Sequence, residues 1–171
     1  MFIAALMDDF SRNAAENALK VMGKQAKPAL MKALDNQCHS DKIESPSILL
    51  QRRSIMRVLA NLPLTVKDWC IIKKMFHDND PEISTLAARL ALGIVNLKQK
   101  KTILRKLIEK IPFANWSVDK EIEDCLVKYY DIARKAIEEE ILKRKMLPIK
   151  EQIYDSVLQI LLNVQRRDGV G

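Results

Sequence analysis

Two groups of side chains in this sequence are of types that do chemistry. Cys38-His39 beside Asp41 would hold a metal ion or form an activated thiolate, and Glu138-Glu139-Glu140 supplies adjacent carboxylates for acid and base steps. Neither pattern is complete, because His39 lacks a second histidine at helical spacing and consecutive helical carboxylates point about 100° apart. The sequence therefore predicts no catalytic residue, no metal and no cofactor, and favours a protein that is not an enzyme.

Other patterns lead to the same expectation. The interior glycines, Gly23 and Gly93, are too few for a phosphate-binding loop. Trp69 and Trp116 raise the question of nucleobase stacking, although the position of Trp69 at the start of a helix favours half-buried packing. A second acidic group is interpreted as a solvated face, and it comprises Asp119, Glu121, Glu123 and Asp124.

The elements that must position these residues are all helices. Ser45-Pro46 and Asp80-Pro81 place a capping side chain before a proline at the first helical position, and Thr65 with Asp68 resembles a capping box. We expect the end of one helix at 2–8 and further helices at 10–23, 26–37, 47–61, 66–77, 82–95, 99–111, 118–130, 132–146 and 149–165.

The apolar pattern of these helices repeats. The first helices of successive pairs align through Ala18-Leu19, Val58-Leu59 and Ala91-Leu92. The second helices align through Leu30 and Leu34, then Ile72 and Phe76, then Leu104 and Ile108. A helix pair copied in this way must stack on its neighbours to bury its apolar stripe, which predicts an α-solenoid of about four antiparallel pairs plus one terminal unpaired helix.

The residues that carry this pattern resemble a known family. The motifs are Asp8-Asp9-Phe10-Ser11-Arg12-Asn13-Ala14-Ala15, Ala18-Leu19, Gly23, Pro28-Ala29-Leu30 and Ala33-Leu34-Asp35, and later Asp80-Pro81-Glu82, Ala87-Ala88 and Ala91-Leu92. They resemble short HEAT-like repeats of the kind also seen in phycobilisome lyases, over residues 2–112 and, by helix spacing alone, over 117–165. The resemblance implies an armadillo-like superhelix in a single domain, 1–171, that works as a scaffold or binding surface.

Charge supplies the best clue to a partner. Residues 46–112 hold most of the excess of basic side chains behind the formal net charge of +7. Lys32, Lys74 and Lys106 occupy one repeat position, two residues before Leu34, Phe76 and Ile108, so we expect them on the concave side of the solenoid. The candidate partner-binding residues are Lys32, Lys73, Lys74, Lys101, Arg105, Lys106 and Lys110. At the next repeat the equivalent residue is Glu139, which would end the basic row.

Three functions follow from this pattern. The preferred one is a scaffold or adaptor whose basic groove holds an acidic protein partner. The first alternative is a nucleic-acid binder that uses the same cations on phosphates. The second is an enzyme on the same fold, similar to the lyases or to the DNA alkylation repeat glycosylases, which would need a polar pocket.

The ends and the cysteines complete the expectations. Residues 153–164 are apolar around most of the helix, which predicts a cover from a further repeat, a dimer partner or folding back, and leaves open a fragment of a longer solenoid. Cys38, Cys70 and Cys125 are odd in number and scattered, which favours a reducing compartment. With no signal peptide and no apolar run long enough for a membrane span, we expect a cytoplasmic protein.

Overall fold

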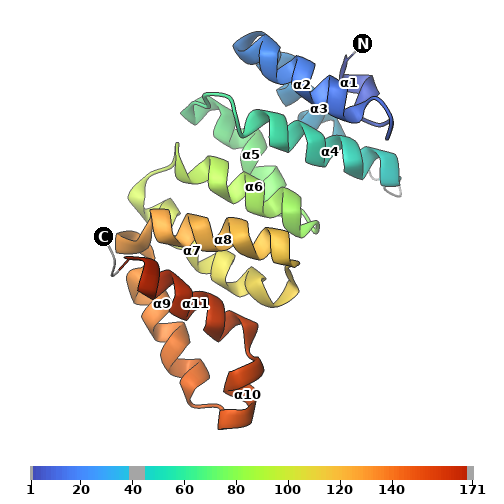
Figure 1. The fold of residues 1–171 in the computed structure, drawn as a ribbon. Coiled ribbons are helices and arrows are strands. Elements are labelled where there is room, and N and C mark those ends of the chain that lie inside the picture. The colour runs from blue at the N-terminus through green and yellow to red at the C-terminus, as the bar shows by residue number, and fades with distance from the viewer. Residues whose placement is uncertain (1, 39–44, 169–171) are drawn as a thin grey trace. The chain divides into compact units, whose positions relative to one another are not determined.

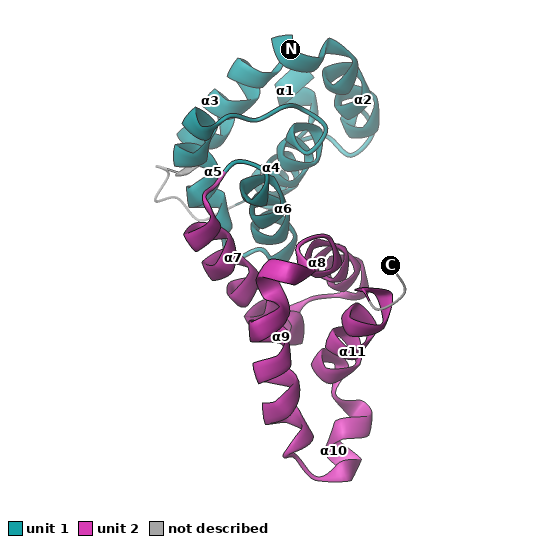
Figure 2. Cartoon of the chain, turned by 90° about the vertical axis from the view of Figure 1, so that its left-hand side faces the viewer, with its two compact units in different colours: residues 1–94 teal, residues 95–171 magenta. Residues whose placement is uncertain are grey.

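A computed structural model of the chain describes residues 2–38 and 45–168. Within these residues every regular element is a helix and there is no strand, which confirms the all-α prediction (Figure 1). The chain divides into two compact units, unit 1 at residues 1–94 and unit 2 at residues 95–171 (Figure 2). No helix in the described part of the chain is both long enough and apolar enough to cross a bilayer.

Unit 1 contains six α-helices and two single turns of 3-10 helix within its described residues. They are α1 (Phe2–Ala5), α2 (Arg12–Met22), η1 (Gly23–Gln25), α3 (Lys27–Cys38), α4 (Pro46–Leu59), η2 (Val66–Asp68), α5 (Trp69–Phe76) and α6 (Pro81–Leu92). Helix α4 packs between α2 and α6, while α3 packs on α4 and α5, and α5 packs on α6. The first helices of successive pairs are therefore neighbours, as the repeat pattern predicts.

The cap residues start these helices as predicted. The Ser45 hydroxyl accepts a hydrogen bond from the Ile48 amide, and the Asp80 carboxylate accepts one from the Ile83 amide. Thr65 and Asp68 form the predicted capping box at η2. Each cap satisfies an amide that has no partner within its own helix, so the helix begins where the sequence places the capping side chain.

The repeated apolar positions form the core. Leu30 and Leu34 of α3 and Ile72 of α5 are fully buried, and Phe76 nearly so. The small residues Ala87, Ala88 and Ala91 of α6 are also completely buried. Alanine at these positions allows α6 to pack closely against both α4 and α5.

Unit 2 is built from five α-helices and one 3-10 turn in its described part. They are α7 (Leu97–Lys110), η3 (Ile111–Phe113), α8 (Trp116–Lys128), α9 (Tyr130–Lys145), α10 (Ile149–Tyr154) and α11 (Ser156–Asp168). Helix α7 packs on α8 and α9, and α11 packs on η3, α8 and α9. Leu104, Ile108, Ile137 and Ile141 are buried at the positions that the repeat predicts.

The helix expected at 149–165 is two helices, so this boundary prediction is wrong. Asp155 separates α10 from α11 with an extended backbone (φ −78°, ψ 98°), and its carboxylate caps α11 by accepting a hydrogen bond from the Leu158 amide. Helix α11 folds back on unit 2 and buries Val157, Leu161 and Val164. The large apolar residues of the predicted segment that are exposed all belong to α10, and they are Ile149, Ile153 and Tyr154.

Candidate partner-binding groove

An open groove of about 570 Å³ runs between α7 and α9 in unit 2. Its lining contains five basic side chains and two acidic ones. The basic residues are Lys98, Lys101, Arg105, Lys106 and Lys135, and the acidic residues are Glu109 and Asp131. The groove exists because α7 and α9 bury their apolar sides through Leu104 and Ile137, which leaves the charged positions of both helices facing the space between them.

The start of α7 is unusually basic for a helix N-terminus. Asn96 and Gln99 form a capping box there, and the first turn contains no acidic residue. Lys98 and Lys101 are exposed and, among the described residues, have no carboxylate partner. The helix macrodipole places a partial positive charge at the same end, so cations there are unfavourable for the helix and favourable for an anionic ligand.

Arg105 marks the transition to a more acidic stretch of the same groove. Its guanidinium donates to Glu139 on α9 at 3.3 Å, and both side chains remain more than half exposed. A smaller adjoining hollow of about 280 Å³ is lined by Glu109, Glu139, Glu140 and Lys143, among others. The cationic end of the groove is therefore followed by a mixed end.

The sequence-predicted lysines and arginine divide between the two units. Lys101, Arg105 and Lys106 line the groove of unit 2, and Lys110 lies on the same helix, half-buried and outside the lining. In unit 1, the remaining three are Lys32 on α3 and Lys73 and Lys74 on α5.

The three lysines of unit 1 differ in their surroundings. Lys32 and Lys73 are exposed. The Lys74 ammonium donates to Asp35 of α3 at 2.8 Å, so part of its charge is already compensated within unit 1. A single row of lysines across both units stays a prediction.

Sequence reasoning missed two basic residues of the groove, Lys98 and Lys135. Lys98 precedes Lys101 by one turn of α7, and the absence of acidic residues from this helix start was a signal that could have found it. Lys135 lies on α9, and nothing in the sequence connects it to α7, because only the packing of the two helices brings it to the groove.

The acidic and aromatic candidates have different surroundings. Glu123 and Asp124 accept hydrogen bonds from Arg167 of α11 at 2.7 and 3.0 Å. Burial raises the pKa of Asp119. Trp69 is half-buried as expected, whereas Trp116 is 83% exposed.

Of the metal candidate, Cys38 is the last residue of α3, and His39 and Asp41 lie outside the described residues. In the part of the chain that is described, no three His, Cys, Asp or Glu side chains gather closely enough to hold a metal ion.

The fold and groove define an all-α protein with a charged surface groove. Comparisons with known proteins add no relative: no protein-family model matches the chain, and neither a curated protein nor a solved structure matches it.

Proposed function

We propose that this protein is a non-catalytic scaffold or adaptor that binds an acidic segment of a protein partner in the groove between α7 and α9. The observation that carries the proposal is the concentration of five basic side chains around one open groove of unit 2. Their charges attract an acidic chain and speed its encounter. The proposal includes a HEAT-like α-solenoid as the architecture and, from the scattered cysteines, a cytoplasmic location.

The form of the groove supports a protein segment. It is partly open to solvent, and it mixes cations with Glu109 and Asp131. The acidic side chains would pair with basic or amide groups of a protein segment, whereas they would repel the uniformly negative backbone of a nucleic acid.

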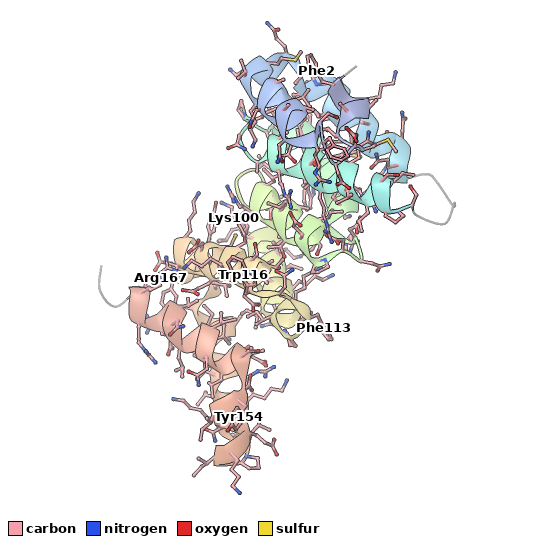
Figure 3. The ribbon with its side chains drawn as sticks, turned by 45° about the vertical axis from the view of Figure 1, so that its right-hand side comes forward. Phe2, Lys100, Phe113, Trp116, Tyr154 and Arg167 are labelled. Carbon is pink, nitrogen blue, oxygen red and sulfur yellow. The ribbon has the colours of Figure 1, made fainter. Side chains whose placement is uncertain are left out.

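Nucleic-acid binding is the second candidate because of two exposed aromatic residues. Figure 3 labels Phe113 of η3 and Trp116 of α8, whose side chains are 81% and 83% exposed. Exposed aromatic rings can stack on unpaired bases. Binding that depends on phosphates would weaken steeply with salt, and each lost phosphate contact would reduce the salt dependence by about one unit of slope.

The two candidates are separated by one titration series. A fluorescent Asp- and Glu-rich peptide and a short DNA, tested both duplex and single-stranded, are titrated with the protein between about 50 and 200 mM salt. The test variant is Lys98→Glu/Lys101→Glu. The control is Lys24→Glu/Lys67→Glu, which reverses two exposed lysines of unit 1 and makes the same change to the formal net charge of +7.

We expect the groove variant to weaken peptide binding by at least about tenfold, because two attractions become repulsions, while the control binds nearly as the wild type does. Equal losses in the two variants would mean that net charge, rather than the groove, attracts the peptide, and would refute the proposal. DNA binding that exceeds peptide binding and is lost in the groove variant would replace it with the second candidate.

A further inference from the structure

The hairpin that joins α9 to α11 has exposed apolar side chains and no core of its own. None of residues 142–156 is buried. We call residues 142–154 the α9–α10 tip. Its large hydrophobic residues are all exposed, and they are Leu142, Met146, Leu147, Ile149, Ile153 and Tyr154. A contiguous exposed group of this kind marks a surface that contacts something apolar.

Hydrogen bonds and ion pairs, rather than a buried core, hold the tip together. Arg144 donates to both carboxylate oxygens of Asp155 at 2.8 and 2.7 Å, and to Glu140 at 2.8 Å. The side-chain amide of Gln152 donates hydrogen bonds to the backbone carbonyls of Lys145 and Leu147. The hydrogen-bonding groups therefore satisfy one another at the base of the hairpin, and the apolar side chains are left outside it.

The tip also projects from unit 2. Figures 1 and 2 show α10 at one end of this unit, and α9 is the helix on which it packs. Figure 3 shows Tyr154, which is 87% exposed, at the opposite end of unit 2 from Arg167. A protruding apolar hairpin is suited to inserting into a deformable surface such as a lipid bilayer. In a protein–protein interface, by contrast, the residues that contribute most of the binding energy cluster at the centre of a well-packed patch.

The charged side chains of the tip indicate which kind of surface it contacts. Lys143, Lys145 and Lys150 are exposed within the tip, against a single acidic residue, Glu151. Lys145 and Lys150 have no ion-pair partner among the described residues. Long lysine stems beside aliphatic side chains can keep their ammonium groups at the level of lipid phosphates, and a tyrosine is amphipathic in the same way.

We propose that the α9–α10 tip inserts shallowly into the interface of an anionic lipid bilayer, with its aliphatic residues among the acyl chains and its lysines at the headgroups. A second copy of the chain is a poorer occupant. A symmetric contact through the tip would bring the same lysines of two molecules together, and like charges oppose such a contact.

The test is co-sedimentation with phosphatidylcholine vesicles that contain or lack phosphatidylserine. The test variant is Ile149→Ser/Tyr154→Ser, and the control is Phe10→Ser/Val21→Ser, whose side chains are at least as exposed but lie in unit 1. Since none of the four residues is in the core, all variants are expected to fold, and circular dichroism with thermal unfolding verifies this.

We expect wild type and control to bind the anionic vesicles at least about tenfold more tightly than neutral ones, and the tip variant to lose at least about tenfold in affinity. Failure of the wild type to sediment overturns the proposal, as does equal binding to neutral vesicles or undiminished binding by the tip variant. Self-association in solution that the tip variant abolishes would assign the tip to a second copy.

Binding to the acidic peptide in place of vesicles, abolished by the tip variant, would assign the tip to a protein partner. The tip variant is expected to leave binding at the α7–α9 groove unchanged, because none of its changes lines that groove. The two proposals can therefore fail separately.

Discussion

Replacing Lys98 and Lys101 with glutamate should stabilise the protein while it weakens binding in the groove. Lys98 lies in the first turn of α7, next to the positive end of the helix macrodipole, and no acidic residue compensates it there. A favourable charge at such a position stabilises a helix by about 0.3 to 1 kcal/mol. Lys98→Glu replaces an unfavourable charge with a favourable one, so it should raise the free energy of unfolding by about 1 kcal/mol.

The second substitution adds to this gain. Lys101 stands four residues before Arg105 on the same helix, and like charges at this spacing destabilise a helix. Glutamate at position 101 turns the repulsion into attraction, which adds about 0.5 kcal/mol. For a chain of 171 residues, the combined gain corresponds to a rise in Tm of about 4 °C.

Thermal unfolding by circular dichroism measures the stability, and peptide anisotropy measures the binding. A higher Tm together with an affinity loss of at least about tenfold is the signature of residues retained for function at a cost in stability. A lower Tm would show that the two lysines make stabilising contacts and would refute the electrostatic reasoning. A higher Tm with unchanged affinity would show that the two lysines are ordinary solvent-exposed charges with no role in binding.

Three further predictions concern single helices within the two units, α6 in unit 1 and α7 and α11 in unit 2. Asp80→Ala should cost about 2 to 4 kcal/mol in urea unfolding, because it removes both the cap of α6 and the ion pair with Arg53, whereas Asp80→Asn should cost clearly less because asparagine is also a good cap. Burial acts to raise the pKa of Asp155, but the hydrogen bonds from Arg144 and the Leu158 amide outweigh it and lower that pKa. Its contribution to stability is thus present above the unfolded-state pKa of about 3.9 and is lost as the pH falls through the lower folded-state pKa. Urea titrations should therefore show that Asp155→Asn lowers the unfolding free energy more at pH 7 than near pH 2. Leu104→Ala should lower the unfolding free energy by about 3 kcal/mol, and hydrogen exchange should show the loss of protection in unit 2; a loss under about 1 kcal/mol would contradict the burial of this side chain.

The helices were predictable because their signals are local. Ser45-Pro46 and Asp80-Pro81 start α4 and α6 as expected, since a cap and a proline act within a single turn. The break at Asp155 has an equally local signal, an aspartate three residues before the Leu158 amide that it caps. The apolar residues on both sides concealed it, because they continue the pattern of a helix through position 155.

The candidate site was predictable only in part. Charge patterning placed Lys101, Arg105 and Lys106 on one helix, and they do line a groove. Their surroundings depend on other helices: Glu139 beside Arg105 and Asp35 beside Lys74 come from residues 34 and 39 positions away in the chain. Such pairs decide how much charge each cation presents, and only tertiary packing brings their members together.

The distribution of charge along α7 is the strongest physical argument for a groove with a function. Helices are stabilised by acids at the first turn, yet the first turns of α7 present Lys98 and Lys101 to the groove and the first turn contains no acid. Only the last turn, with Lys110, has a charge that suits the macrodipole. This arrangement lowers the stability of the helix, and the core below it, centred on Leu104 and Leu107, does not require it. An acidic ligand bound over the first turns would turn the same lysines into favourable contacts, so ligand binding supplies the compensation that the isolated helix lacks.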